Sequence, residues 1–330
     1  MRSYLVTGGA GFIGSHLCDA LLARGHRVVA LDDLSTGSRD NIAHLEAETR
    51  FNLHVGNVSD RERLDLLVVS ADAVFHLAAA VGVRLVVENP ARTIETNVLG
   101  TAAVLESASM HRKPVLLTSS SEVYGKATKV PFSESDDLVF GNTSIGRWSY
   151  GCSKAVDEYL ALAFAREARL RVIIARLFNT VGPRQTGKYG MVLPTFVHQA
   201  LRGEPLTVHG DGSQRRCFCA VGDVVEALIA LLEHPASAGQ VINVGSEEEV
   251  SIGELAERVR VLAGSSSPIV HVPYDEAWDD QFEDMQRRIP SLDRVRKLIG
   301  FSCRQTLDDM IRSVIAQERA RQSAEGLRPA

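Results

Sequence analysis

The stretch Leu5–Asp33 reads LVTGGAGFIGSHLCDALLARGHRVVALDD and decides the fold. It begins in a short apolar run of strand type, continues through a glycine cluster, and then carries apolar residues at helical spacing. A second apolar run, Val28 to Leu31, ends on two aspartates. Strand, glycine-rich turn, helix, strand and acid in this order are typical of a unit that holds a dinucleotide pyrophosphate against a helix N-terminus.

Each residue type in this unit has a physical role. Gly8 allows a sharp turn, Gly11 removes a side chain where the backbone approaches the pyrophosphate, and Gly14 lets the helix pack close to the strand. Asp32 can accept hydrogen bonds from the adenosine ribose hydroxyls and would repel a 2′-phosphate, which favours NAD over NADP. The cofactor contacts predicted in this unit are Gly8, Gly11, Phe12, Ile13, Gly14, Asp32, Asp33 and Ser35.

The composition limits the class of protein. The 330 residues are 45% hydrophobic and 23% charged, with a net charge of -5, as in an ordinary globular protein of one large or two modest domains. A basic cluster typical of nucleic-acid binding is missing, and no apolar run reaches the roughly 18 residues of a membrane span. Five scattered cysteines argue against a disulfide framework and a metal site, and the first residues leave no room for a signal peptide. We expect a cytoplasmic enzyme without a metal, nucleic-acid or membrane partner.

The order of the elements predicts the architecture. Short β-branched runs alternate with helical patterns up to about Arg176, which indicates an α/β fold with a doubly wound parallel sheet of Rossmann type. The chain then becomes rich in Gly, Pro, Arg and Gln, as in a ligand-facing loop at the carboxyl edge of such a sheet. A smaller, interleaved C-terminal substrate domain should follow. The predicted division is an NAD-binding domain of residues 1–178 and 218–246, a substrate domain of residues 179–217 and 247–318, and a polar tail, 319–330, that we expect to be disordered.

The clearest catalytic pattern is Tyr150-Gly-Cys-Ser-Lys154. At a helix start, positions i and i+4 lie on one face. The Lys154 ammonium, together with the positive nicotinamide of bound NAD, should lower the pKa of the Tyr150 phenol toward working pH. Tyrosinate can then take a proton from a sugar hydroxyl while hydride moves from the same carbon to NAD. Lys154 also has the reach to hold the nicotinamide ribose. An amphipathic helix that carries Tyr and Lys by chance is the alternative, which the preceding dinucleotide unit disfavours.

The G-x-x-G-x-x-G spacing and the DDLSTG after Leu31 resemble the extended short-chain dehydrogenase/reductase superfamily, with its NAD-dependent nucleotide-sugar epimerases, dehydratases and decarboxylases. In LLTSSSEVYG, Leu116 to Gly125, the resemblance makes Ser120 the hydrogen-bond partner of the reacting hydroxyl and Glu122 a carboxylate directed at C5. UDP-galactose-type epimerases carry a neutral residue where Glu122 stands. Ser121-Glu122 also lacks the C6 acid of dTDP-glucose dehydratases, although GDP-mannose-type dehydratases use Ser-Glu. Asn97 resembles the superfamily's structural Asn. The further cofactor contacts expected are Asn57, Val58, Leu77, Ala78, Ala79, Asn97, Tyr150 and Lys154.

The stretch GDGSQRRCF, Gly210 to Phe218, together with VGDVVEAL, NVGSEEEVSIGELAE and FEDMQRRIPSLDRVRKLIGF, resembles the UDP-glucuronate decarboxylases, over roughly residues 1–315. In that family, oxidation at C4 of a UDP-uronate gives a β-keto acid, and loss of CO₂ leaves an enolate that Tyr150 and Ser120 can stabilise. Glu122 or Arg216 could then help to reprotonate C5. The catalytic residues implied are Ser120, Glu122, Tyr150, Lys154 and Arg216; the substrate contacts are Ser121, Asn179, Arg184, Val192, Arg216 and Arg288, with Arg287 as the alternative to Arg288.

Other functions stay open at this point. A UDP-sugar or UDP-uronate 4-epimerase would need only Ser120, Tyr150 and NAD, and VGVRLVVENPARTIETNVLGT is closer to the general epimerase pattern. Nucleotide-sugar 4,6-dehydration is a third reaction. A non-enzymatic NAD-binding regulatory protein would predict a broken Y-x-x-x-K, which this chain does not have. The resemblance also implies a homodimer in which Pro90–Met110 and Ser149–Ala168 of two copies form a four-helix bundle.

Overall fold

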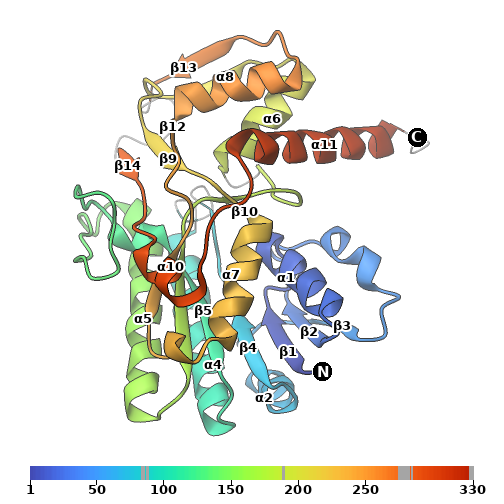
Figure 1. The fold of residues 1–330 in the computed structure, drawn as a ribbon, viewed down its shortest axis with the longest axis vertical. Coiled ribbons are helices and arrows are strands. Elements are labelled where there is room, and N and C mark those ends of the chain that lie inside the picture. Colours follow the sequence, from blue (N-terminus) through green and yellow to red (C-terminus); the bar gives the residue numbers. More distant parts are fainter. Residues whose placement is uncertain (83–85, 87–88, 188–189, 274–282, 284, 327–330) are drawn as a thin grey trace.

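A parallel sheet forms the centre of the molecule (Figure 1). The computed structural model describes residues 1–326 except 83–85, 87–88, 188–189, 274–282 and 284. Within these residues seven strands pair in parallel in the order β11-β6-β5-β4-β1-β2-β3. This is the doubly wound order in which ligands bind at the carboxyl edge. The strands are β1 (Ser3–Thr7), β2 (Arg27–Asp32), β3 (Phe51–Val55), β4 (Ala73–His76), β5 (Val115–Ser120), β6 (Val172–Leu177) and β11 (Val241–Val244).

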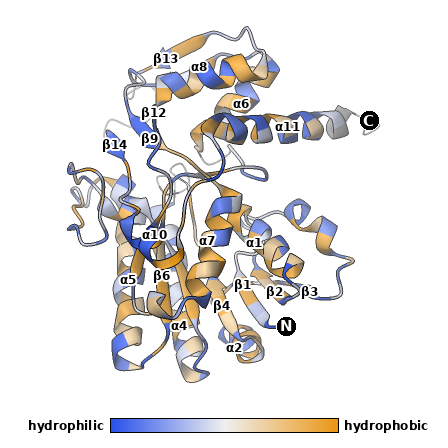
Figure 2. Cartoon of the chain, in the orientation of Figure 1, coloured by the Kyte–Doolittle hydropathy of each residue, from blue (hydrophilic) through white to orange (hydrophobic). Residues whose placement is uncertain are grey.

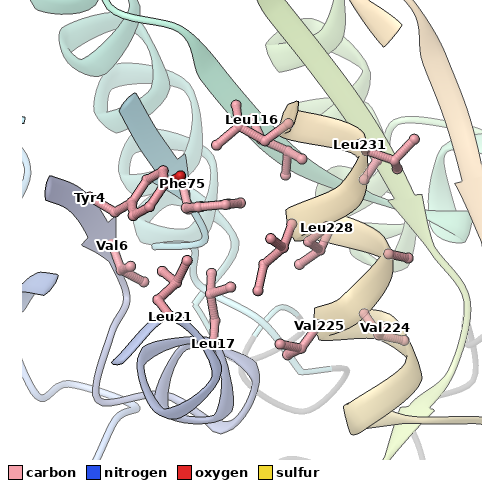
Figure 3. Close-up of a cluster of buried hydrophobic side chains, with 14 of the residues drawn as sticks. Tyr4, Val6, Leu17, Leu21, Phe75, Leu116, Val224, Val225, Leu228 and Leu231 are labelled. Carbon is pink, nitrogen blue, oxygen red and sulfur yellow. The ribbon is translucent and has the colours of Figure 1, made fainter. Parts of the chain in front are cut away.

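Helices cover both faces of this sheet. One apolar cluster joins the sheet to α1, α7 and α10, and a second joins it to α2, α4 and α5. In the first cluster, Leu17 and Leu21 of α1 meet Leu228 of α7 over Val6 and Phe75 (Figure 3). Each such leucine stabilises the fold by about 1.5–3 kcal/mol through burial. The helices are α1 (Phe12–Ala23), α2 (Arg61–Ser70), α4 (Pro90–Met110), α5 (Ser149–Glu167), α7 (Val221–Glu233) and α10 (Asp293–Ile299).

A smaller unit lies beyond the carboxyl edge, at the top of Figure 1. Its apolar cluster is built from Leu193 and Phe196, Leu255 and Val259, and the buried face of the last helix. Figure 2 shows apolar residues concentrated on α7 and the sheet, with α11 far more polar. None of the described helices is long and apolar enough to span a membrane. The elements of this unit are α6 (Val192–Arg202), β8 (Leu206–His209), α8 (Ile252–Ala263), β13 (Ile269–Val272) and α11 (Leu307–Gly326).

Short strands connect the two parts. The middle strand, β9, pairs with β12 on one side and β14 on the other, which places Arg216 directly opposite Arg288. Residues that are far apart in the chain therefore meet beside the main sheet. The short elements are β7 (Thr180–Val181), β9 (Arg215–Cys217), β10 (Cys219–Ala220), β12 (Glu249–Ser251), β14 (Arg287–Arg288) and the 3-10 turns Arg39–Asn41, Ala43–Leu45, Ser121–Tyr124, Gly146–Trp148 and Pro235–Ser237.

Two details differ from the sequence predictions. Helix α10 lies within the segment predicted for the substrate domain, yet Val295 packs into the cluster of the main sheet. The expected disorder of the tail is wrong for residues 319–326, because α11 continues to Gly326. Polar composition suggested disorder, but Ala, Arg, Gln and Glu are strong helix formers, and Arg319 donates to the Ala263 carbonyl at 3.0 Å. Residues 327–330 lie outside the described residues.

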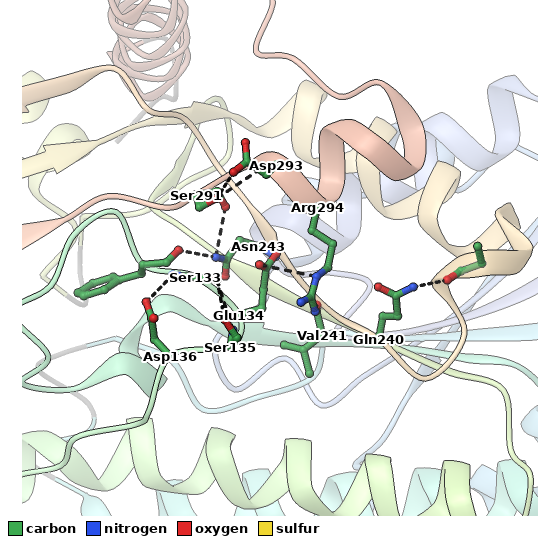
Figure 4. A network of polar contacts seen from close by, with 12 residues as sticks. Ser133, Glu134, Ser135, Asp136, Gln240, Val241, Asn243, Ser291, Asp293 and Arg294 are labelled. Atoms are coloured by element: carbon green, nitrogen blue, oxygen red, sulfur yellow. Dashed lines mark hydrogen bonds and ion pairs between the residues drawn. The ribbon is translucent and has the colours of Figure 1, made fainter.

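A polar network secures the segment that follows β5 (Figure 4). Asn243 of β11 donates from Nδ2 to the Phe132 carbonyl at 2.9 Å, and its Oδ1 accepts a hydrogen bond from the Tyr124 hydroxyl at 2.7 Å. Glu134 accepts from the Asn243 backbone N–H at 2.9 Å and lies 3.8 Å from Nε of Arg294. The chain that leaves the end of β5 is therefore tied to the edge of the sheet.

Candidate active site

A cavity of about 680 Å³ follows the carboxyl edge of the main sheet and continues under the smaller unit. One end is formed by the glycine turn before α1 and by the ends of β2 and β3. The other end is formed by the end of β5, the start of α5, β9 and β14. The sequence-predicted residues that line the cavity are Gly8, Gly11, Phe12, Ile13, Gly14, Asp32, Asp33, Ser35, Asn57, Val58, Leu77, Ala78, Ala79, Ser120, Ser121, Glu122, Tyr150, Lys154, Asn179, Val192, Arg216 and Arg288.

The glycine turn is shaped for a ligand that approaches the backbone closely. Gly8 has a φ of 72°, and a Cβ there would lie 2.8 Å from the backbone nitrogen of Ala78. A Cβ on Gly14 would lie 2.0 Å from the Gly8 carbonyl oxygen. Any side chain at these positions would push the turn away from the sheet. The turn and the start of α1 therefore fit the pyrophosphate of a dinucleotide, as the sequence predicts.

Two carboxylates stand at the adenosine end of the cavity. Asp32 accepts hydrogen bonds from the backbone N–H groups of Ala10 at 2.9 Å and Leu34 at 2.8 Å. Asp33 is exposed and accepts from Nδ2 of Asn57 at 2.7 Å. Partial burial would raise the pKa of Asp33, but its hydrogen bonds from Ser35 and Asn57 outweigh this and lower the pKa. Both acids are suited to ribose hydroxyls and unsuited to a 2′-phosphate, and Asn57 braces the second of them.

Asn97 lies under the cavity and does not line it. Its side chain accepts a hydrogen bond from the Ala80 backbone N–H at 2.8 Å and donates to the Ser153 hydroxyl at 3.0 Å. The Ser153 hydroxyl in turn donates to the Tyr150 carbonyl at 2.8 Å. Asn97 therefore ties the loop after β4 to the first turn of α5, which is a positioning role and not direct contact with a cofactor.

Ser120, Tyr150 and Lys154 all line the cavity. Ser120 ends β5, Tyr150 begins α5, and their side chains share a hydrogen bond. Lys154 does not by itself lower the Tyr150 pKa: burial and then the negative charge of Glu122 raise it, although Ser120 and Arg147 oppose the shift. The part of the lowering expected from the nicotinamide stays a prediction. Lys154 donates to Oδ2 of Asp157 at 2.8 Å. The negative charge of Asp157 therefore offsets part of the positive charge that Lys154 would exert on Tyr150.

Beyond Tyr150 lies an arginine cluster, by which we mean Glu122 with Arg147, Arg216 and Arg288. One Glu122 oxygen lies 2.6 Å from Nη1 of Arg288, and the other lies 2.6 Å from Nη1 of Arg147. All four side chains are largely buried. Burial would raise the Glu122 pKa, but Arg147 and Arg288, with a smaller effect of Arg216, lower it to about 2. Glu122 is therefore held as an anion between two arginines, which disfavours a role as the acid that protonates C5.

The remaining predicted substrate residues divide into two groups. Asn179 lines the cavity and donates to the Cys217 carbonyl at 2.8 Å, and Val192 begins α6 in the cavity wall. Arg184 is not among the cavity residues, which corrects the prediction: its guanidinium lies 2.8 Å from Asp19 of α1. Arg287 is exposed and pairs with Glu249 at 2.9 Å, so Arg288 is the member of the pair that reaches the cavity.

Two residues at this site are absent from the sequence prediction. Arg147 stands three positions before Tyr150, but only the tertiary structure shows that it closes on Glu122. Asp157 stands one turn after Lys154, where an i, i+3 pair could have been noticed. The described residues hold no group of acids, histidines and cysteines able to bind a metal ion.

Comparisons with known proteins agree with this geometry. The family model of the NAD dependent epimerase/dehydratase family matches residues 4–245. UDP-N-acetyl-alpha-D-glucosaminuronate decarboxylase of Bacillus cytotoxicus is 43% identical over 298 residues, which cover 90% of this chain and 91% of that protein. UDP-glucuronic acid decarboxylase 1 of Arabidopsis thaliana is 36% identical, over 96% of this chain and 70% of that protein.

A solved structure extends the likeness to the whole fold. The UDP-glucuronic acid 4-epimerase of Bacillus cereus, in complex with UDP-glucuronic acid and NAD, superposes with a TM-score of 0.87 at 27% identity. The superposition covers 96% of this chain and 99% of that chain. The glycine turn, the paired acids and the Tyr150–Lys154 pair occupy the cavity that such a fold provides for its cofactor. The chain therefore belongs to the NAD-dependent epimerase/dehydratase family.

Proposed function

We propose that the chain is an NAD-dependent decarboxylase of a UDP-uronic acid that works through a 4-keto intermediate. The arginine cluster is the observation that carries the uronate part of this proposal, and the named relatives favour decarboxylation. Among the described residues, three arginines and one carboxylate face the sugar end of the cavity, beside Ser120 and Tyr150. Nε of Arg288 is buried and has no hydrogen-bond partner in the described part of the chain. A carboxylate on C5 would meet these guanidinium groups in the geometry that they favour.

The relatives support a uronate as the substrate. Those of Bacillus cytotoxicus and Arabidopsis thaliana are named for the decarboxylation of UDP-N-acetylglucosaminuronate and UDP-glucuronic acid. Both compounds carry a carboxylate at C5 and differ in the substituent at C2. The arginine cluster would bind the C5 carboxylate, which the two compounds share. A neutral UDP-hexose would leave the arginines without that contact.

The residues suggest a division of labour during the reaction. Tyr150 takes the proton of the C4 hydroxyl, Ser120 holds the same oxygen, and Lys154 holds the cofactor ribose. When bound, NAD accepts the hydride of C4 and can return it. CO₂ loss moves negative charge from the carboxylate to O4, where the Ser120 and Tyr150 hydroxyls can stabilise it.

Glu122 has a different role in this scheme from that of a proton donor. The arginines favour the carboxylate of the bound uronate, and a strong grip would oppose its departure as neutral CO₂. Because Glu122 already shares the charge of Arg147 and Arg288, the cluster can orient the carboxylate without holding it too tightly. Arg216 donates to the Arg215 carbonyl at 2.9 Å and is the third arginine that lines this end of the cavity.

A UDP-uronate 4-epimerase is the second candidate. The Bacillus cereus epimerase structure contains UDP-glucuronic acid, so a cavity of this fold can hold a uronate without removing its carboxylate. The arginine cluster fits both reactions, and a product assay separates them.

Incubation of the purified protein with NAD⁺ and each of UDP-glucuronate, UDP-N-acetylglucosaminuronate and UDP-glucose is expected to release CO₂ from at least one uronate and none from UDP-glucose. Mass spectrometry of the nucleotide sugars is the measurement. An unchanged mass with an inverted C4 proton signal would establish epimerisation instead, and loss of water would establish dehydration. Absence of any conversion would overturn the enzyme proposal.

We further propose that two copies associate through α4 and α5, which pack side by side. Their outer surfaces expose Leu99 and Ile94 of α4 and Tyr159 and Val156 of α5, with Leu99 62% and Tyr159 68% exposed. Large exposed apolar side chains on two neighbouring helices are typical of a subunit interface. A second copy would present the same helices and form a four-helix bundle around a two-fold axis.

The double substitution Leu99→Glu, Tyr159→Glu is expected to convert the dimer into a monomer, because it would bury four carboxylates at the interface. Light scattering coupled to gel filtration measures the mass. Leu66→Glu on α2, where the leucine is 68% exposed, is the matched control and should leave the mass unchanged. A wild-type protein that is already monomeric would refute the interface.

We propose a reducing compartment such as the cytoplasm for this enzyme. All five cysteines are thiols, and three of them, Cys18, Cys217 and Cys219, are buried. Free buried thiols are usual where glutathione keeps cysteines reduced.

A further inference from the structure

Asp157 is a fully buried carboxylate beside the proposed catalytic pair. Tyr150, Lys154 and Asp157 stand at positions i, i+4 and i+7 of α5, which lie on one face of a helix. Their exposed fractions are 8%, 2% and 0%. Asp157 therefore lies on the same face of α5 as Tyr150 and Lys154, but deeper in the protein, on the side of α4.

The carboxylate of Asp157 is tied to the ammonium of Lys154. Nζ of Lys154 donates to Oδ2 of Asp157 at 2.8 Å. Burial raises the pKa of Asp157, and the Lys154 charge opposes the shift. A buried ion pair is often no more stable than apolar residues of similar volume. The gain from Asp157 therefore depends on Lys154: a lysine that must stay buried and charged beside the cofactor needs a counter-ion, and Asp157 supplies it.

Several charged and polar groups surround Tyr150, Lys154 and Asp157. Asp157 also faces Thr101 of α4 and is near Glu158 of its own helix. His76 of β4 faces Lys154 and stays neutral, because burial and then the Lys154 charge lower its pKa to about 3. Tyr150 faces Ser120, Glu122 and Arg147, and Asp157 is one of the two anions that raise its pKa.

We propose that Asp157 is a positioning residue: it fixes the Lys154 ammonium and offsets its charge, and it thereby sets the pH at which Tyr150 becomes a base. This inference rests on the proposed roles of Tyr150 and Lys154. With Asp157 in place, the Lys154–Asp157 pair carries almost no net charge, so Tyr150 keeps its proton in the protein without a ligand. The positive charge that favours release of this proton then comes from Arg147, which already opposes the raised pKa, and from the oxidised nicotinamide of bound NAD. Tyr150 then becomes a base only in the loaded enzyme.

The test is a titration of Tyr150 in the protein saturated with NAD⁺ and without any sugar nucleotide. Near-ultraviolet absorbance reports tyrosinate, and subtraction of the same protein carrying Tyr150→Phe isolates this residue. Asp157→Asn keeps an oxygen acceptor for Lys154 but removes the negative charge, so the midpoint of tyrosinate formation should fall. Residues seven apart in a helix are about 10 Å apart, and one charge at that distance corresponds to a shift of about 1 pH unit. The acidic limb of the pH profile of kcat should move in the same direction.

Glu158→Gln is the matched control. Glu158 is the next residue and is also buried, but it pairs with Arg176 at 2.7 Å and accepts from the Ser119 hydroxyl at 2.5 Å. Its replacement should weaken the fold and move the Tyr150 midpoint less than Asp157→Asn does, because Glu158 is not among the main charges that act on Tyr150. Asp157→Glu should restore a midpoint close to that of the wild type. Asp157→Ser provides the neutral variant if the asparagine variant does not fold.

The outcomes separate this inference from the substrate assignment. An unshifted midpoint in both neutral variants, or an equal shift in Glu158→Gln, would overturn the role of Asp157 even if CO₂ is released normally. A shifted midpoint in a protein that converts neither uronate would keep the role of Asp157 and overturn the proposed substrate.

Discussion

Replacement of Tyr150 by phenylalanine is expected to lower kcat by about 10²- to 10⁴-fold, which is the usual contribution of a general base. The phenol is buried, lines the cavity, shares a hydrogen bond with Ser120 and lies beside the arginine cluster. Phenylalanine fills the same space but can neither take the C4 proton nor stabilise negative charge on O4. Steady-state turnover of the uronate that releases CO₂ measures the effect.

NAD binding should survive this substitution, because the glycine turn, the paired acids and Lys154 are untouched. Binding by calorimetry and turnover must be compared in the same preparation. Tyr4→Phe is the matched control: Tyr4 is also buried, but it packs against Phe75 and His26 under the sheet, so its loss should leave kcat near the wild-type value. Wild-type turnover by Tyr150→Phe would refute the role of Tyr150.

Replacement of Glu122 by glutamine is expected to lower the free energy of unfolding by about 3 kcal/mol at neutral pH, since it removes the anion that Arg147 and Arg288 share in a buried place. The sign of the pH dependence follows from the depressed pKa. The folded-state pKa of Glu122 is about 2, against an ordinary 4.5. The stability from this group should be complete above about pH 4.5 and be lost as the pH falls toward 2. Chemical denaturation across this range measures it.

A double-mutant cycle of Glu122→Gln with Arg147→Met isolates the pair. Each single variant leaves a buried charge without its partner, so both should lower the free energy of unfolding. The double variant should lose less of this free energy than the two single losses added together, with a coupling above about 1 kcal/mol. Glu257 and Arg260 of α8 form the control, since they are 2.6 Å apart but exposed, and exposed pairs couple by about 0–1 kcal/mol. An equal coupling in both cycles would contradict a buried clamp at Glu122.

Several site residues follow from local sequence because their geometry is local. Gly8 and Gly14 lie within one turn and one helix start, and Tyr150 and Lys154 lie one helical turn apart. Ser120 was predicted from the resemblance to the superfamily, and the structure places it at the end of β5, at the carboxyl edge where ligands bind in such sheets. Arg184 illustrates the limit. Its loop was correctly expected near the site, but its side chain points to Asp19 instead of the cavity.

The sequence by itself determined the sheet and the cofactor, because each depends on a turn, a helix face or a strand end that neighbouring residues specify. The chemistry proposed at C4 came from the resemblance to the family. Only the tertiary structure decided the environment of that chemistry. The register of β14 on β9 places Arg288 beside Arg216, and the turn before α5 closes Arg147 on Glu122. The pKa values of Glu122 and Tyr150 depend on charged groups that belong to separate elements and on the burial of both side chains. The combined effect of charges that are distant in the sequence cannot be predicted from the residue spacing within one motif.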